Sequence, residues 1–226
     1  TVCVTGASGF VGSWLVKSCL ERGYRVRACV RNVDDDGKTG FLKAMPSYNE
    51  GKLTLHSADM TVPGSYDQIF EGCSTVFHPA EVYMSTYNAL GVIGGKKLEA
   101  SLNMREANSS LHAGALTTAQ NIVDSINKSS TVNRLVYTSS VAAMAGSMPR
   151  HPIVDESCEA AGSPNDYGPT KRLIEKFFDY AAHSSGGKWS MAIGNPVDIV
   201  GPILSPHQAT DTWQGKIGLI IQGSSV

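Results

Sequence analysis

Tyr167 and Lys171 stand four positions apart, within the run 166–171. If a helix begins at Tyr167, the phenol and the ammonium lie one turn apart on the same helix face. A free phenol has a pKa near ~10, and a neighbouring ammonium lowers that pKa because it stabilises the phenolate. Such a pair can act as a general acid, and the lysine can also hold a ribose. The same spacing arises by accident in many helices, so this interpretation depends on the surrounding motifs.

Two serines, Ser139 and Ser140, close an apolar, strand-like run before this pair. In open α/β sheets, the residues at the C-terminal ends of the strands carry the chemistry. A hydroxyl at such a strand end can donate to a carbonyl oxygen as negative charge develops on it. The serines therefore support the interpretation of Tyr167 as a proton donor.

The chain opens with a glycine turn, in which Gly6, Gly9 and Gly12 separate a short strand-like run from a helical pattern. Residues without Cβ permit a tight turn, and the N-terminus of the following helix directs its unpaired N–H groups toward phosphates. The spacing differs from the commoner Gly-x-Gly-x-x-Gly, so a glycine-rich turn without a ligand stays an alternative. Together, the turn, the serines and the Tyr–Lys pair predict an enzyme that moves a hydride to or from a nicotinamide.

The end of the second predicted strand bears on the choice of cofactor. An acidic residue there would accept from the ribose 2′-OH of NAD, whereas this chain carries Arg31. A guanidinium binds phosphate oxygens through two hydrogen bonds, so Arg31, with Lys38 seven residues further on, favours NADP(H). Two alternatives stay open: Arg31 could be a solvated side chain, and one of the three aspartates 34–36 could face the ribose instead.

Two further strand ends could line the cofactor. Asp59, with Met60 beside it, could accept from the adenine amino group, although an aspartate in this place can also cap a helix or close a turn. Pro196 and Val197 follow the sixth predicted strand. Their backbone groups could meet the nicotinamide carboxamide, or the proline could simply end the strand.

The elements that must position these residues alternate along the chain. Strands are expected at 1–4, 24–30, 52–56, 75–78, 135–139 and 189–194, and helices at 10–22, 41–45, 66–70, 107–128 and 167–183. This alternation predicts an α/β fold of the Rossmann type, a doubly wound parallel sheet with helices on both faces. Residues 1–204 would form the dinucleotide-binding domain, 84–106 a surface excursion, and 205–226 the start of an incomplete substrate region.

Composition limits the partners. The 226 residues carry a formal net charge of −1, which gives no overall field that would attract nucleic acid or an anionic membrane. No apolar run approaches the roughly 20 residues of a membrane helix. Five scattered cysteines lack the spacing of a metal site, so we expect no metal, reduced thiols and a cytoplasmic protein. The sequence does not indicate an oligomeric state.

These motifs resemble the extended short-chain dehydrogenases/reductases, and within them the branch of dihydroflavonol reductase and cinnamoyl-CoA reductase. The resemblance rests on segments 5–12, 30–31, 76–78, 136–140, 167–171 and 195–202, which occur in order. It implies a catalytic triad of Ser140, rather than Ser139, with Tyr167 and Lys171. It also implies the following cofactor-binding residues: Gly6, Gly9, Phe10, Val11, Gly12, Arg31, Lys38, Asp59, Met60, Pro79, Ala80, Tyr167, Lys171, Pro196, Val197 and Ile199.

The function expected from the residues and the resemblance is NADPH-dependent reduction of a small-molecule carbonyl compound: an aldehyde, a ketone or an acyl-CoA. Tyr167 would protonate the carbonyl oxygen, Ser140 would orient it, and Lys171 would assist Tyr167. A sugar-nucleotide epimerase or dehydratase, which retains NAD, is an alternative against which Arg31 argues. A non-catalytic NADP(H)-binding sensor is another, and proteins of that kind often lack the tyrosine that is present here.

Overall fold

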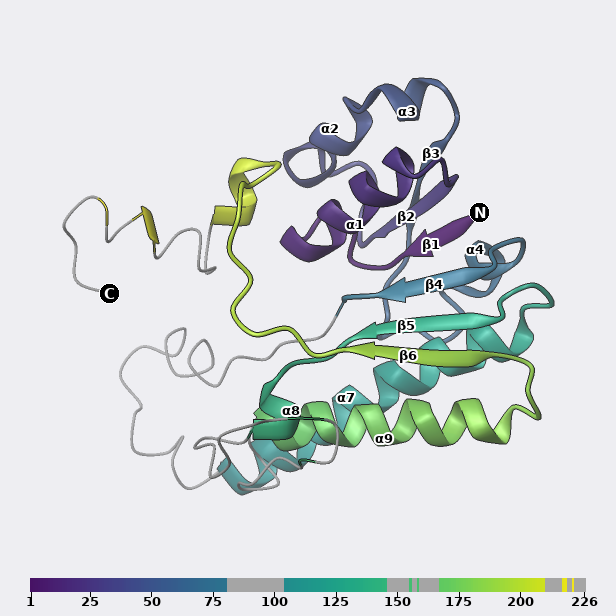
Figure 1. The fold of residues 1–226 in the computed structure, drawn as a ribbon, viewed down its shortest axis with the longest axis vertical. Helices are drawn as coiled ribbons and strands as arrows, with labels where there is room; N and C mark the ends of the chain where they lie inside the picture. Colours follow the sequence, from purple (N-terminus) through teal and green to yellow (C-terminus); the bar gives the residue numbers. More distant parts are fainter. Residues whose placement is uncertain are drawn as a thin grey trace.

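A six-stranded parallel sheet forms the centre of the computed structural model (Figure 1). Its strands are β1 (Val2–Val4), β2 (Val26–Val30), β3 (Leu53–Ser57), β4 (Thr75–His78), β5 (Arg134–Thr138) and β6 (Ser190–Gly194). The spatial order is β3-β2-β1-β4-β5-β6. The order therefore reverses between β1 and β4, which is the place where ligands bind in open α/β sheets. The structure describes residues 1–80, 104–145, 155, 158, 167–209, 217–218 and 221.

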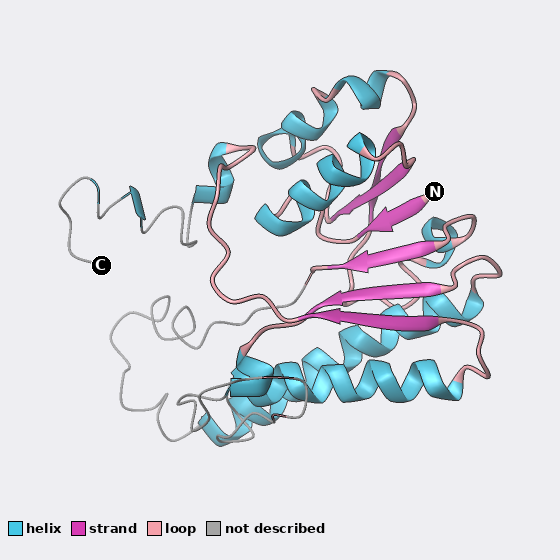
Figure 2. Cartoon of the chain, viewed as in Figure 1, coloured by secondary structure: helices cyan, strands magenta, loops and turns pink. Residues whose placement is uncertain are grey.

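Helices cover both faces of the sheet (Figure 2). On one face lie α1 (Phe10–Glu21), α2 (Asp36–Lys43) and α3 (Pro46–Asn49); on the other lie α4 (Asp67–Phe70), α7 (Met104–Lys128) and α9 (Tyr167–Ser184). The short α8 (Ala142–Ala145) follows β5, and a 3-10 helix, η1 (Pro206–Ala209), follows the last strand. The doubly wound fold predicted from the alternation is confirmed.

Two apolar cores, one on each face, hold these layers together. Val4, Val16 and Leu42 are fully buried in the core beneath α1 and α2. Phe70, Ile122, Ile126, Leu135 and Phe178 are fully buried in the core beneath α4, α7 and α9. A sheet covered on both faces buries nearly continuous apolar strands, which is the pattern of β1, where all three residues are buried.

Several element boundaries differ from the predicted ones. β2 begins at Val26 rather than at residue 24, because the Tyr24 N–H bonds to the Cys19 carbonyl at the end of α1. In place of the single short helix expected at 41–45, the structure has two: α2 begins earlier, at Asp36, and ends at Lys43, and α3 begins at Pro46. α8 was not predicted, since four residues carry no periodicity.

The predicted excursion at 84–106 mostly lies outside the described residues. Its last three positions belong to α7, which begins at Met104 rather than at residue 107. Four cysteines, Cys3, Cys19, Cys29 and Cys73, are buried, as expected of structural thiols. In the described part of the chain, no helix is both long and apolar enough to cross a membrane.

Candidate active site

The glycine turn after β1 leaves no room for a side chain at Gly6 or Gly12. Gly6 adopts φ +56°, and a Cβ there would lie 2.9 Å from the Cβ of Ala80. A Cβ on Gly12 would lie 2.2 Å from the Gly6 carbonyl oxygen. Gly6 is therefore needed for the turn itself, and Gly12 for the close approach of α1 to the turn.

The start of α1 suits an anion. Gly9 precedes the helix, and no side chain of the described residues caps its first turn, which also lacks acidic residues. The unpaired N–H groups and the positive end of the helix dipole are therefore directed at the space above the glycine turn.

A cleft of about 890 Å³ opens above this turn, at the C-terminal edge of the sheet. Such a volume lies within the range of small-molecule and cofactor sites. Predicted cofactor-binding residues that line it are Gly6, Gly9, Phe10, Val11, Gly12, Arg31, Asp59, Met60, Pro79, Ala80 and Tyr167. The cleft therefore brings together the glycine turn, the ends of β2, β3 and β4, and the start of α9.

Six of the predicted site residues do not line this cleft: Lys38, Ser140, Lys171, Pro196, Val197 and Ile199. Lys38 lies in α2, with its Nζ 3.5 Å from Asp35 Oδ2. Val197 is 70% exposed. Ile199 lines a separate groove on the outer side of α1.

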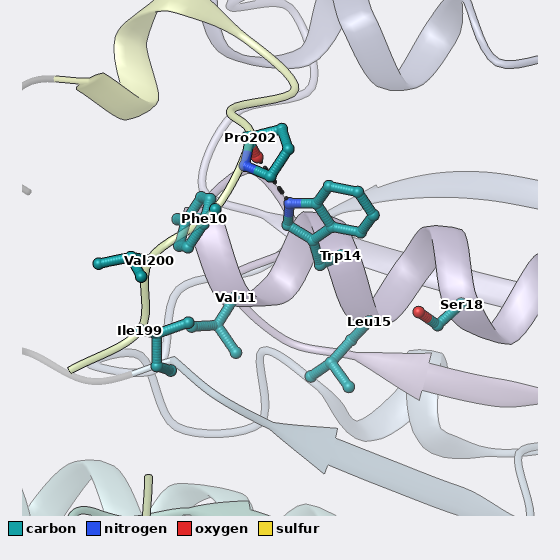
Figure 3. A pocket seen from close by; sticks show the side chains of 9 residues that line it. Phe10, Val11, Trp14, Leu15, Ser18, Ile199, Val200 and Pro202 are labelled. Carbon is teal, nitrogen blue, oxygen red and sulfur yellow. Dashed lines mark hydrogen bonds between the residues drawn. The ribbon is translucent and has the colours of Figure 1, made fainter. Parts of the chain in front are cut away.

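That groove, of about 300 Å³, runs between α1 and the segment after β6 (Figure 3). Phe10, Val11, Trp14 and Leu15 form one wall, and residues 199–202 form the other. The Trp14 indole N–H donates to the Pro202 carbonyl over 2.9 Å, which ties the two walls together. No side chain that lines the groove is titratable, so it offers no acid–base chemistry.

The corner of the cleft at the end of β2 carries an arginine. Arg31 is exposed there, beside the Asp59 carboxylate. Two of the three aspartates that could have faced a ribose are instead occupied by lysines: Asp35 by Lys38 at 3.5 Å, and Asp36 by Lys43 at 2.6 Å. These pairs favour Arg31 as the residue that meets a ligand at this corner.

Asp59 closes a turn and also lines the cleft. Its Oδ1 accepts from the Thr61 N–H at 2.8 Å and from the Thr61 hydroxyl at 2.7 Å, which closes a turn. These two hydrogen bonds, with a smaller contribution from Arg31, lower the pKa of the carboxyl group below its ordinary value. The residue nevertheless lines the cleft, as an acceptor for an adenine amino group would.

Tyr167 is the first residue of α9 and lines the cleft together with the glycine turn. Its side chain is 40% exposed, and the Lys171 Nζ lies 5.7 Å from its ring centre. Gly168 lets the first turn of α9 approach α8 closely: a Cβ on Gly168 would lie 2.3 Å from the Ala142 carbonyl oxygen. The phenol is thus open to the cleft, with the ammonium close to its ring.

Lys171 is only 3% exposed and lies against the end of β5. Its Nζ donates to the Tyr137 hydroxyl at 3.4 Å and to the Thr138 carbonyl at 3.3 Å. His78 stacks on Tyr137 and is hydrogen-bonded to the Thr5 hydroxyl at 2.8 Å. Burial, and to a lesser extent Lys171, lower the pKa of His78 to about 3, so this ring is neutral and belongs to the core.

The two serines differ in their surroundings. Ser139 is buried, and its hydroxyl has no hydrogen-bond partner among the described residues. Ser140 is half-buried, and its Oγ accepts from the Ala142 N–H at 3.2 Å. Because this bond uses a lone pair of the oxygen, the hydroxyl hydrogen of Ser140 can be donated to a substrate.

Gln208 contacts the glycine turn, and the sequence had given it no role. Its Nε2 donates to the Ser8 carbonyl at 3.1 Å and to the Ser13 hydroxyl at 3.0 Å, and its Oε1 accepts from the Leu204 N–H at 2.9 Å. His207 Nε2 donates to the same Ser8 carbonyl at 2.9 Å. Roughly 200 positions separate these partners and no motif joins them, so no sequence signal could have linked them.

Comparison with known proteins gives a consistent result. The NAD dependent epimerase/dehydratase family matches residues 2–222. Dihydroflavonol 4-reductase of Callistephus chinensis is 39% identical over 91% of this chain and 53% of its own length. Cinnamoyl-CoA reductase CAD2 of Medicago truncatula is 31% identical over 91% of this chain and 59% of its own length. The chain therefore spans little more than half the length of these relatives.

A solved structure agrees with this result. Vestitone reductase from alfalfa (Medicago sativa) superposes with a TM-score of 0.69, at 28% identity, over 91% of this chain and 59% of that one. The resemblance predicted from the motifs, to the branch of dihydroflavonol reductase and cinnamoyl-CoA reductase, is confirmed by these relatives.

Proposed function

The chain belongs to the NAD dependent epimerase/dehydratase family, and we propose that it works there as an NADPH-dependent reductase of small-molecule carbonyl compounds. One observation carries the proposal: the Tyr167 phenol faces the cleft above the glycine turn, with the buried Lys171 ammonium 5.7 Å from its ring centre. A proton donor is thereby directed at the space in which the glycine turn would hold a dinucleotide.

The cleft fits a dinucleotide at several independent points. Gly6 and Gly12 allow a pyrophosphate to approach the backbone, and the open start of α1 complements its charge. Arg31, with Lys38 nearby, would hold the 2′-phosphate, and this assignment favours NADP(H) over NAD. Asp59 and Met60 would line the adenine, and Pro79 and Ala80 would line another part of the cofactor.

In this proposal the bound nicotinamide supplies the hydride, and the chain supplies the proton and the orientation. Tyr167 donates its phenolic proton to the carbonyl oxygen as that oxygen gains negative charge. Ser140 donates a hydrogen bond to the same oxygen. Lys171 stabilises the phenolate that is left, and would also hold the nicotinamide ribose.

The names of the relatives support a class of substrate. Two of them are named for a dihydroflavonol and for cinnamoyl-CoA. We therefore propose an aldehyde, a ketone or an acyl-CoA as the substrate. Residues 1–204 would form the dinucleotide-binding domain, with the substrate region beginning at residue 205.

The description of the family favours a second candidate, an epimerase or dehydratase that oxidises a bound sugar nucleotide and then reduces it again. Such an enzyme regenerates its cofactor in every cycle. A sensor that binds NADP(H) without turnover is the third candidate, and the paired Tyr167 and Lys171 argue against it.

Cofactor accounting separates these candidates. The purified chain is incubated with NADPH and a panel of aromatic aldehydes, ketones and acyl-CoA thioesters, and the oxidised cofactor and the product are both quantified. A reductase consumes one NADPH for each carbonyl group that it reduces. Conversion of a sugar nucleotide without net cofactor consumption would favour the second candidate, and NADPH binding without turnover would favour the third.

A further inference from the structure

We propose that Glu175 and Asn195 are positioning residues that hold the loop at Ser140 against helix α9. They would thereby set the distance between Tyr167, the proposed proton donor, and Ser140, the proposed hydrogen-bond donor. The inference rests on the proposed function, because Ser140 and Tyr167 are the residues to be positioned. Neither Glu175 nor Asn195 touches the cleft, so both would act through Ser140.

Glu175 lies on α9 one helical turn after Lys171 and is only 2% exposed. Its Oε2 accepts from Arg172 Nη1 at 2.9 Å, and its Oε1 accepts from Asn195 Nδ2 at 2.6 Å. A carboxylate is buried at this depth only where charge and hydrogen bonds compensate for the lost water. Both of its oxygens have such a partner here.

Asn195 carries the connection from the helix to the serine. Its Nδ2 also donates to the Ser140 carbonyl oxygen at 3.0 Å, so both hydrogens of the amide have an acceptor. One side-chain amide therefore joins the helix that carries Tyr167 to the residue that carries the proposed hydrogen-bond donor.

The residues on both sides of Ser140 are hydrogen-bonded through their backbone N–H groups to residues at the end of β6. The Ser139 N–H donates to the Gly194 carbonyl at 2.8 Å, and the Val141 N–H donates to the Pro196 carbonyl at 2.9 Å. With the Asn195 amide on the Ser140 carbonyl, three successive residues are attached to the end of β6. Of these attachments, only the one from Asn195 continues to α9.

This arrangement matters for catalysis because Ser140 and Tyr167 lie on different elements, the end of β5 and the start of α9. Both must reach one substrate oxygen, and a misplacement of about 1 Å can lower a rate roughly 100-fold. Backbone bonds hold Ser140 to β6, while α9 contacts the neighbouring residues through Gly168, which packs on Ala142, and through Lys171, which donates to the Thr138 carbonyl. The chain Glu175–Asn195–Ser140 adds a hydrogen-bonded constraint on Ser140 itself.

The first test uses kinetics in two backgrounds. We expect Glu175→Ala and Asn195→Ala each to lower kcat for carbonyl reduction about 10- to 100-fold, with the Kd for NADPH unchanged. In a Ser140→Ala background the same substitutions should cause little further loss, because the hydroxyl that they position is absent. Equal losses in both backgrounds would overturn the proposal, since they would indicate a general structural role.

Two variants control this experiment. Glu175→Gln keeps an oxygen that can accept from Asn195, and should retain most of the kcat that Glu175→Ala loses. Glu21→Ala removes an exposed carboxylate at the far end of α1, which pairs with Lys17, and should leave kcat unchanged. If Glu175→Ala does not fold, Asn195→Ala carries the test, because Asn195 is only half-buried.

The second test does not need activity. Hydrogen exchange followed by mass spectrometry should show that Asn195→Ala accelerates exchange of the Ser139 and Val141 amides at least about tenfold, with β2 unchanged. Unchanged exchange at these amides would overturn the inference. If the parent chain reduces no carbonyl compound, the proposed function fails, and this measurement alone decides whether the two residues hold the serine loop.

Discussion

Arg31 is the residue that we propose decides the choice of cofactor. It is exposed at the corner of the cleft, while Asp35 and Asp36 are paired with lysines of α2. Two of the three aspartates that could have accepted from a ribose hydroxyl are thus paired with lysines, and the guanidinium is the group at this corner suited to a 2′-phosphate.

This interpretation predicts the effect of Arg31→Ala on cofactor affinity. The Kd for NADPH should rise about 10- to 100-fold, which corresponds to the loss of charge-assisted hydrogen bonds, and the Kd for NADH should change little. Lys38→Ala should have a smaller effect, because Lys38 does not line the cleft. Fluorescence titration of both dinucleotides measures these constants, and an unchanged ratio of the two would remove Arg31 from the site.

His78 predicts a pH dependence of stability. Its pKa in the folded chain is lowered to about 3, whereas an unfolded histidine titrates near ~6.5. As the pH falls below the unfolded value, only the unfolded chain gains this proton, so the free energy of unfolding decreases by at most about 1.4 kcal/mol per pH unit.

Denaturant unfolding between about pH 5 and 7 measures this dependence above the range in which carboxylates titrate. His78→Asn should flatten the dependence. His56→Asn is the control, because burial lowers the pKa of His56 as well. This variant should keep the part of the pH dependence that His78 causes. An equal slope in the parent and in His78→Asn would contradict the assignment of a neutral, buried ring.

At the scale of elements, the contact between α1 and the glycine turn leaves no space for an additional methyl group. Gly12→Ala would place a Cβ within 2.2 Å of the Gly6 carbonyl oxygen, so α1 must shift away from the turn. We expect loss of NADPH binding together with a lower free energy of unfolding.

Gly40 provides the matched control for this substitution. It lies inside α2, and nothing lies within 4 Å of a Cβ placed there. Gly40→Ala should raise the free energy of unfolding by about 0.5–1 kcal/mol and leave NADPH binding unchanged. Thermal unfolding and titration on the two variants test the packing argument, which would be wrong if Gly12→Ala behaved like Gly40→Ala.

The contact between η1 and the glycine turn predicts a second effect on the cofactor. Gln208 is buried, and its Nε2 donates to the Ser8 carbonyl and to the Ser13 hydroxyl. Gln208→Ala removes both of these hydrogen bonds to the glycine turn. Each bond contributes about 1 kcal/mol, and relaxation of the turn recovers part of the loss, so the Kd for NADPH should rise about tenfold. Ser185→Ala, whose hydroxyl lies at the far end of α9, should leave this Kd unchanged.

At the scale of the whole molecule, local patterns were enough to predict the sheet and most of the cleft. The alternation of strands and helices determines a parallel sheet with helices on both faces, and the C-terminal strand ends then bring Arg31, Asp59 and Ala80 together. Arg31 and Asp59 could be predicted because they stand one and two residues after a strand, whereas Ala80, two residues after β4, was assigned from the family resemblance.

The remaining features depend on contacts between distant segments, which no local pattern encodes. Gln208 meets Ser8 only because the chain returns to the glycine turn after β6. Glu175 joins Ser140 through Asn195, and the helical period could show only that Glu175 lies one turn from Lys171. The position of Ile199 was likewise decided by the path of the chain across α1, which the motif 195–202 does not contain.

Tyr167→Phe tests the proposed reductase most directly, because it removes one oxygen from the cleft and leaves the ring in place. We predict that the variant binds NADPH as the parent does, while kcat for carbonyl reduction falls about 10²- to 10⁴-fold, the usual contribution of a general acid. A Tyr167→Phe protein that reduced the same carbonyl compound at the rate of the parent would contradict the account.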